Sequence, residues 1–286
     1  MSKLYKELSI IMVSYYSSDM INRCLSSIPD NISIIIVNNA VKDNLKLKIK
    51  RSKNIKIYTP RKNLGNGGGF NYGLNKSNCK FSMYLDVDTS INKKTLNKLM
   101  SIAKTEKEWG IIAPNIKNYN YKKDYIIRRV NNKIFEMNFV EGCALLFNNK
   151  EIKHLGYYDD KFFLYYEEND IFFKYLKHNK KILLVKDCII EHIGNSSVNK
   201  NYKFEIELNR NWHLMWSKFY YFKKNHSYFT GVKKTIKSLL SAIIKSLVYY
   251  LVDYKKSQIY YNRMHGLLCS YLNRPSFRRP KINEDL

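Results

Sequence analysis

The sequence predicts an α/β fold built on a mainly parallel sheet, and three observations lead to that prediction. The chain has 286 residues, of which 45% are hydrophobic, so it is long enough to bury one large core. Short apolar runs alternate with segments of helical periodicity through the first half of the chain. Polar residues directly follow several of these runs, where the ligands of parallel sheets bind.

The apolar runs are short and several are rich in Ile and Val, which is typical of buried strands. Between them, Leu96, Leu99, Met100 and Ala103 recur at helical spacing, and Pro29 ends an earlier helical segment. Strands that alternate with helices pair in parallel through crossover connections. The predicted strands are residues 8–13, 32–37, 55–58, 81–85 and 182–185, and the predicted helices are residues 19–28, 67–76 and 93–104.

From about residue 201 the chain becomes aromatic, basic and helical, so we predict a first domain over residues 1–200 and a helical region over residues 201–286. Residues 231–253 form its clearest amphipathic helix. Two interpretations of this helix stay open. It is either an interfacial helix whose lysines face anionic headgroups, or a helix packed on the domain. Its apolar positions are 236, 239, 240, 243, 244, 247 and 251, and its polar positions are 234, 237, 241 and 245.

The N-terminal residues lack the apolar stretch of a signal peptide, and the five cysteines are widely spaced with no C-x-x-C pair. We therefore expect a cytoplasmic protein with reduced cysteines. Lys245 interrupts the most apolar stretch, so no membrane-spanning helix is expected.

Lys and Arg number 50 and Asp and Glu 24, which gives a net charge of +26. Such a charge favours nucleic acid, an anionic membrane surface or a phosphorylated substrate as partner. A nucleic-acid-binding protein is one alternative function, although the sequence contains no RRM, KH, zinc-finger or helix-turn-helix pattern.

Three local motifs could carry chemistry. Residues 63–71 are rich in glycine, but the G-x-G-x-x-G pattern of dinucleotide sites fails at Phe70. Two interpretations of this segment stay open: its backbone approaches a nucleotide, or it is a flexible turn. Asp86 and Asp88 follow an apolar strand, where carboxylates suit a divalent cation that holds a diphosphate. Residues 167–170 place three acids at a helix start, which suits either the helix dipole or a general base.

These motifs occur together and in order in one family. The chain resembles the inverting glycosyltransferases of family 2 with the GT-A fold, and most closely the bacterial rhamnosyl- and galactofuranosyl-type enzymes. The resemblance covers about residues 8–225 and implies a GT-A catalytic domain over residues 1–200. Its matching segments are residues 9–15, 63–71, 85–89, 162–170 and 191–194.

The resemblance implies a role for each matching residue. Glu168 matches the general base, while Glu167 and Asp170 match neighbours that bind the acceptor or support the site. Asp88 and His192 match ligands of a Mn²⁺ or Mg²⁺ ion, although a lone histidine is more often structural. The residues matched to the nucleotide-sugar pocket are Ser14, Asn38, Gly65, Gly68, Asn71 and Asp86.

Two residues depart from the family pattern. Asn38 stands where the family usually has Asp, which puts the preference for the donor base in doubt. Glu168 stands where the base is usually Asp and is one methylene longer.

The resemblance implies metal-dependent, inverting transfer of a sugar from dTDP-rhamnose or a UDP-sugar to a glycan or lipid-linked glycan. It also suggests a role in capsule or surface polysaccharide synthesis, peripheral on the inner face of the cytoplasmic membrane. A non-catalytic nucleotide-sugar-binding module is the other alternative, if Glu168 is inert.

Overall fold

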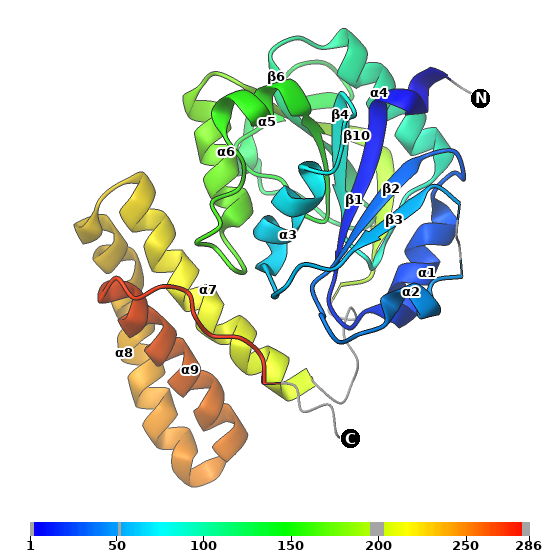
Figure 1. Cartoon of the computed structure of the whole chain (residues 1–286). Coiled ribbons are helices and arrows are strands. Elements are labelled where there is room, and N and C mark those ends of the chain that lie inside the picture. The colour runs from blue at the N-terminus through cyan, green and yellow to red at the C-terminus, as the bar shows by residue number, and fades with distance from the viewer. Residues whose placement is uncertain (1–2, 51–52, 195–202, 282–286) are drawn as a thin grey trace. The chain divides into compact units, whose positions relative to one another are not determined.

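The computed structural model describes residues 3–50, 53–194 and 203–281 (Figure 1). The chain forms two compact units. The first comprises residues 1–157 and 171–198, and the second comprises residues 158–170 and 199–286. The sequence predicts one boundary near residue 200, whereas the structure also assigns the short segment 158–170 to the second unit.

The first unit is an α/β fold around one mixed sheet (Figure 1). Its strands are β1 (Leu8–Ser14), β2 (Ser33–Asn38), β3 (Ile55–Tyr58), β4 (Phe81–Leu85), β5 (Thr89–Ser90), β6 (Trp109–Ile116), β7 (Ile126–Arg129), β8 (Ile134–Met137), β9 (Ala144–Asn148) and β10 (Lys181–His192). Its helices are η1 (Lys3–Glu7), α1 (Ser18–Ser27), α2 (Leu45–Lys48), α3 (Gly65–Leu74), α4 (Lys93–Thr105), η2 (Lys123–Tyr125) and α5 (Asn149–Leu155). Helix α6 (Glu167–Lys177) begins in the second unit and continues in the first.

The strand order is β3-β2-β1-β4-β9-β6-β10-β8-β7, and β5 pairs with the end of β10. All five predicted strands are present. The prediction of a mainly parallel sheet is wrong, because β9 inserts between β4 and β6 and runs antiparallel to both. Strands β7 and β8 add a further antiparallel pair beside β10. The parallel pairs are β1 with β2, β2 with β3, β1 with β4, and β6 with β10.

Apolar side chains of β1, β2 and β4 form the centre of the core of the first unit, and Ile10, Ile34 and Met83 are fully buried. Helix α4 covers this core with the predicted stripe, in which Leu96 and Met100 are buried. Because burying a large apolar side chain contributes about 1.5–3 kcal/mol, these central strands form a rigid base for the loops that follow them.

The described part of the second unit contains the long helices α7 (Lys203–Asn225), α8 (Tyr228–Val252) and α9 (Tyr254–Tyr271), which pack side by side (Figure 1). Helices α7 and α9 approach closely because Gly266 has no side chain. A Cβ atom there would lie 2.2 Å from the backbone oxygen of Trp212. Met215, Phe219, Leu239 and Leu267 form a core between the helices.

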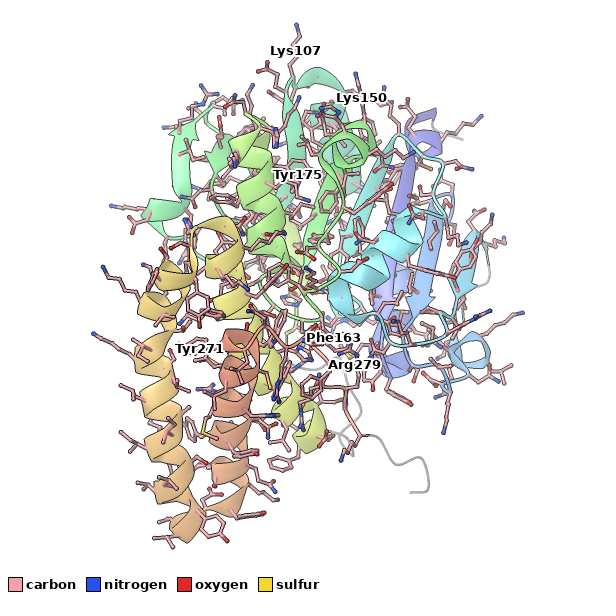
Figure 2. The ribbon with its side chains drawn as sticks, turned by 60° about the vertical axis from the view of Figure 1, so that its left-hand side comes forward. Lys107, Lys150, Phe163, Tyr175, Tyr271 and Arg279 are labelled. Carbon is pink, nitrogen blue, oxygen red and sulfur yellow. The ribbon has the colours of Figure 1, made fainter. Side chains whose placement is uncertain are left out.

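The chain after α9 returns along the second unit. Arg279 lies over the ring of Phe163, with 3.7 Å between its guanidinium carbon and the ring centroid (Figure 2). The Ser276 hydroxyl donates to the Lys161 carbonyl at 2.6 Å. Segment 158–170 is therefore held within the second unit by contacts with residues far along the sequence.

Helix α8 is long and apolar enough to cross a membrane, judged by length and composition alone. It has 25 residues, and an 18-residue window of mean hydropathy 1.4 is only 17% buried. The many Leu, Ile and Val residues around Lys245 keep the mean hydropathy high despite its charge, so α8 is a candidate by composition although a spanning helix is not expected from the sequence.

Candidate active site

Three strand ends come together in the first unit. Strand β1 pairs in parallel with both β2 and β4, so their carboxyl ends share one edge of the sheet. Ser14 at the end of β1 is the register partner of Asn38 at the end of β2. Asp86 and Asp88 directly follow β4. Ligands of α/β sheets bind at this edge, because loops of adjacent strands leave a crevice there.

Asp86, Asp88 and His192 form a cluster in which one ligand atom of each lies within 4.8 Å of the others. The His192 Nε2 atom lies 3.3 Å from Oδ1 of Asp88 and 3.9 Å from Oδ2 of Asp86. A two-residue antiparallel ladder positions the histidine, because His192 at the end of β10 pairs with Thr89 of β5. The ladder follows Asp88 directly, so the acid and the histidine are held together by backbone hydrogen bonds.

The electrostatics of this cluster suit a cation. The hydrogen bond with Asp88 raises the pKa of His192; burial opposes this, while the charges of Asp88, Asp86 and Glu141 raise it further. Asp88 has only 6% of its side chain exposed. The two carboxylates are ligands that Mn²⁺ and Mg²⁺ accept, and the imidazole suits a transition metal, so the residues present fit a divalent cation.

Asp86 has a second set of partners that the sequence did not predict. The Tyr84 hydroxyl lies 2.5 Å from Oδ1 of Asp86 and 2.6 Å from Oδ1 of Asn66. The tyrosine hydroxyl therefore links Asp86 to Asn66 in the first turn of α3. The strand period of two could have found Tyr84, because residues 84 and 86 point to the same face.

The residues matched to the nucleotide pocket are all in the first unit. Ser14 is fully buried, and its hydroxyl contacts that of Ser17 at 2.8 Å. The Asn38 side chain accepts from the Ala40 amide at 3.2 Å and donates to the Asp43 carbonyl at 2.8 Å. Asn38 therefore shapes the loop after β2. Its neighbour Asn39 joins that loop to the glycine-rich segment, because it donates to the Gly65 carbonyl at 2.8 Å.

The glycine-rich segment is helical, so the flexible-turn interpretation is wrong. Gly65, the first residue of α3, has φ +76°, a left-handed conformation that favours glycine. Gly69 and Gly73 allow close packing on β1. Added Cβ atoms would lie 2.8 Å from a methyl of Val13 and 2.6 Å from one of Ile11. Gly68 and Asn71 are buried in the same helix.

The acidic block lies at the start of α6, in the second unit. Tyr165 and Tyr166 both have φ +66°, which turns the chain sharply before the helix. Glu167 and Asp170 are buried, and Glu168 is half-buried. Burial raises the pKa of Tyr166 to about 12. The acids also complement the positive end of the helix dipole.

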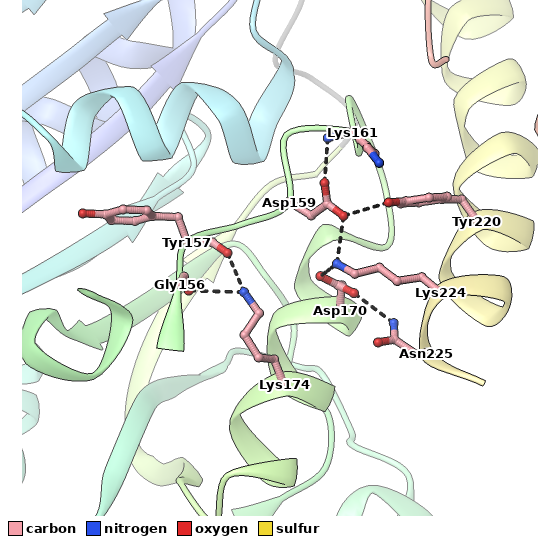
Figure 3. A network of polar contacts seen from close by, with 9 residues as sticks. All are labelled: Gly156, Tyr157, Asp159, Lys161, Asp170, Lys174, Tyr220, Lys224 and Asn225. Atoms are coloured by element: carbon pink, nitrogen blue, oxygen red, sulfur yellow. Dashed lines mark hydrogen bonds and ion pairs between the residues drawn. The ribbon is translucent and has the colours of Figure 1, made fainter. Parts of the chain in front are cut away.

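Asp170 is fixed by residues of α7 (Figure 3). One carboxylate oxygen accepts from Lys224 at 2.8 Å and the other from Asn225 at 2.9 Å. Lys224 also donates to Asp159 at 2.8 Å, and Tyr220 donates to the same Asp159 oxygen at 3.0 Å. Of the two roles that the resemblance gives Asp170, contact with the acceptor or support of the site, these bonds favour support.

Within the first unit, Lys174 of the same helix α6 donates to the carbonyls of Gly156 and Tyr157, at 3.3 Å and 2.7 Å (Figure 3). Each unit thus holds its own part of α6 by a lysine that bridges two oxygen acceptors.

Comparison with known proteins agrees with this geometry. The sequence profile of glycosyl transferase family 2 matches residues 9–170, more than half of the chain and a span that includes Asp86, Asp88 and Glu168. The chain belongs to glycosyl transferase family 2.

Relatives of this glycosyltransferase support the family at the level of fold and reaction type. The low-salt glycan biosynthesis hexosyltransferase Agl10 of Haloferax volcanii is 24% identical over 220 residues, 70% of each chain. The structure of S. aureus TarS 1–349 in complex with UDP has a TM-score of 0.53 and 14% identity, over 97% of this chain and 94% of that one. The mannosyltransferase PcManGT of Pyrobaculum calidifontis has a TM-score of 0.55 and 10% identity, over 93% and 87%. These structures show that the fold is of the GT-A type.

The structure thus brings together Asp86, Asp88 and His192, and it places Ser14 and Asn38 at the strand ends of the same sheet edge. Gly65 of α3 is joined to that edge through Asn39. Glu167, Glu168 and Asp170 form a separate group in the second unit.

Proposed function

We propose that this family 2 glycosyltransferase transfers a sugar from a nucleoside-diphosphate donor to a hydroxyl of a glycan, with inversion at the anomeric carbon. The observation that carries the proposal is the Asp86–Asp88–His192 cluster at the carboxyl ends of the strands. A dinegative diphosphate needs such a site, because the carboxylates cannot bind it without a cation between.

Asp86, Asp88 and His192 would hold the divalent cation, Mn²⁺ or Mg²⁺. When bound, the cation stabilises the negative charge of the departing diphosphate. Mn²⁺ is present in the structures of PcManGT with GDP-Man and of GalNAc-T7 with UDP, which supports the same kind of site here.

The loops after β1 and β2 and the start of α3 would bind the nucleotide, through Ser14, Asn38, Gly65, Gly68 and Asn71. Asn38 is uncharged and already shapes its own loop, so we expect it to recognise the base less directly than an aspartate would. The donor we propose is dTDP-rhamnose or a UDP-sugar. The structure of TarS with UDP-GlcNAc supports a UDP-sugar.

Glu168 is the proposed general base, which takes the proton from the acceptor hydroxyl as that oxygen attacks the sugar. Its half-buried position allows contact with a substrate. Glu167 and Asp170 would support it from the same helical turn. A single displacement of this kind inverts the configuration of the sugar.

The acceptor we propose is a glycan or lipid-linked glycan of a capsule or other surface polysaccharide, at the inner face of the cytoplasmic membrane. The description of Agl10 as a glycan biosynthesis hexosyltransferase supports a glycan acceptor. The long apolar helix α8 supports a location at a membrane.

The decisive experiment replaces Glu168 with Gln and measures sugar transfer and donor binding separately. We expect transfer to be lost while Mn²⁺-dependent binding of the nucleotide-sugar is kept, and Glu168→Asp to restore part of the transfer. Glu108→Gln is the matched control, because the Glu108 side chain is 72% exposed in the first unit. Undiminished transfer by Glu168→Gln would remove Glu168 from this role, whereas donor binding without any transfer by the wild type would favour the non-catalytic module.

A further inference from the structure

Helix α8 has two dissimilar faces. Gly231, Thr235, Leu239 and Ala242 recur at helical spacing and are buried against the rest of the second unit. The Thr235 hydroxyl lies 2.9 Å from that of Tyr271, and Gly231 packs on Phe219. The packing of α8 therefore uses its small side chains.

The large apolar side chains of α8 point outward. They form a row that we call the outward stripe, Leu240, Ile244, Leu247 and Leu251, with exposed fractions of 54%, 60%, 68% and 86%. A row of aliphatic side chains this exposed is unusual on a protein surface and marks a site of interaction.

Beside the outward stripe, α8 and α9, with Met215 of α7, line an open cavity of about 260 Å³. Three cations line it: Lys237 and Lys245 of α8, and Arg263 of α9. Hydroxyl groups complete the polar lining, from Ser238, Ser241 and Tyr260. No carboxylate is among the described residues that line it.

The three cations have no acidic partner in the described part of the second unit, where the ion pairs involve Lys224, Lys256 and Arg278 instead. Arg263 uses its Nε atom to donate to Asn211 at 2.7 Å. Lys245 lies over the ring of Tyr260, with Nζ 5.2 Å from the centroid. Cations gathered in this way favour a ligand with more than one negative charge and several oxygen acceptors, which describes a phosphate group.

The charge of the surrounding helices points to the same ligand. Residues 228–271 contain seven Lys or Arg residues and one acid, Asp253. Asp253 is engaged as the N-cap of α9, where it accepts from the Lys256 amide at 3.1 Å. A second copy of this chain would place a positively charged surface against the positively charged surface of α8 and α9, which is unfavourable. An anionic lipid surface has the opposite charge and is the complementary partner.

Lys237 connects the cavity to the outward stripe. On a helix, the neighbours of residue 237 on one face are residues 240, 241 and 244. Leu240 and Ile244 belong to the outward stripe, and Ser241 lines the cavity. A molecule with a phosphate in the cavity would therefore have apolar side chains beside it.

We propose that this cavity binds the phosphate of a membrane lipid while the outward stripe lies in the interfacial layer of the bilayer, with α8 in the plane of the membrane. The in-plane orientation keeps the contacts of Gly231 and Thr235 within the unit, which a spanning helix would lose. This inference does not depend on the proposed sugar transfer.

The test is co-sedimentation of the full-length protein with phosphatidylcholine vesicles that contain phosphatidic acid, whose phosphate is exposed. Vesicles with phosphatidylserine, adjusted to the same surface potential, are the comparison. We expect tighter binding to phosphatidic acid. Lys237→Gln with Lys245→Gln should weaken that binding about 30-fold, because each basic residue near an anionic surface contributes about 1 kcal/mol, and should remove the preference between the two lipids.

Lys233→Gln with Lys234→Gln is the matched control, since both lysines are exposed on the same helix and neither lines the cavity. This control should weaken binding to both lipids equally and keep the preference. If both double variants lost the preference for phosphatidic acid over phosphatidylserine equally, the proposal that the cavity binds the lipid phosphate would be overturned.

Two further measurements test the membrane itself. Leu247→Gln with Leu251→Gln should reduce binding to every vesicle, while Leu47→Gln, at an 81% exposed position in the first unit, should have no effect. Alkaline carbonate should release the bound protein, and retention would overturn the in-plane orientation. If inorganic phosphate stabilises the protein but no vesicle binds, the ligand is a soluble phosphate and the proposal of a lipid ligand is wrong.

Discussion

Replacing Lys224 with methionine removes the ammonium group that contacts both Asp159 and Asp170 at 2.8 Å. At that distance, and with an effective dielectric constant of about 20, each pair attracts by about 6 kcal/mol before desolvation is counted. Breaking a buried pair costs about 3–5 kcal/mol in practice. Because the Lys224 side chain is 31% exposed, we expect a loss at the lower end of this range, about 3 kcal/mol. The Asp170 side chain is only 2% exposed, and in the variant Asn225 is the α7 residue that still donates a hydrogen bond to it.

The pH dependence of this loss has a defined sign. Burial alone raises the pKa of Asp159, but hydrogen bonds from Lys224, from the Lys161 amide and from Tyr220, together with the Lys224 charge, lower it below its ordinary value. A lowered pKa contributes stability above the unfolded value of 3.8, and that contribution is lost as the pH falls through the folded value. The difference between Lys224→Met and wild type should therefore be full at neutral pH and shrink in acid.

Urea unfolding followed by circular dichroism measures this difference. Lys223→Met is the control, because Lys223 is the half-buried neighbour on α7 and contacts the side chain of Asn273 rather than a carboxylate. Adding Asp170→Asn to Lys224→Met should recover part of the stability, since it removes the unpaired charge. If Lys224→Met were no less stable than Lys223→Met, the reasoning that this network holds the acidic block would be refuted.

Three other predictions concern the metal cluster and two close contacts. His192→Gln should weaken Mn²⁺ binding, measured by electron paramagnetic resonance, at least about tenfold. The Mn²⁺ affinity of the wild type should rise from about pH 6 to about pH 8 as His192 loses its proton. A pH-independent affinity would contradict the role of His192 as a ligand. Gly73→Ala should destabilise the protein by about 1–3 kcal/mol in urea, because the new methyl would meet Ile11 at 2.6 Å, and a neutral effect would show that α3 can move away. Gly266→Ala should cost about 3 kcal/mol, since the 2.2 Å contact is with the backbone of Trp212, and unchanged stability would mean that α7 and α9 separate easily.

Strands β1 to β4 and β10 could be predicted because they contain short apolar runs, and the structure confirms them, whereas β5 to β9 have no predicted counterpart. Their directions could not be predicted in full. Strand β9 (Ala144–Asn148) is apolar as far as Phe147, and nothing in its periodicity indicates that it inserts antiparallel between β4 and β6. The two-residue β5 is too short to leave a pattern, although it determines where His192 lies.

Some residues of the candidate site could likewise be predicted from the local sequence, whereas others could not. Asp86 and Asp88 stand out locally, because they follow an apolar strand directly. His192 required the family resemblance, since its proximity to Asp88 is a tertiary contact. The partners of Asp170 come from α7, whose sequence near Lys224 and Asn225 shows no signal beyond a basic helix end.

Helix α8 shows why an amphipathic pattern alone left two interpretations open. The apolar spacing predicts a face but does not state what covers it. In the structure, Gly231 and Ala242 are buried with Thr235 and Leu239, so small side chains contribute to the packing that large apolar residues usually provide. The remaining large side chains are therefore left on the surface.

The second unit is discontinuous in sequence, and this limits how family members can be recombined. A chimera that exchanged only residues after 200 would separate Asp159 and Asp170 from Lys224, the residue that pairs with both of them. A graft designed on the structure would exchange residues 158–170 together with the helices. Acceptor preference, if it is encoded in this unit, should therefore transfer between relatives only when both segments move as one cassette.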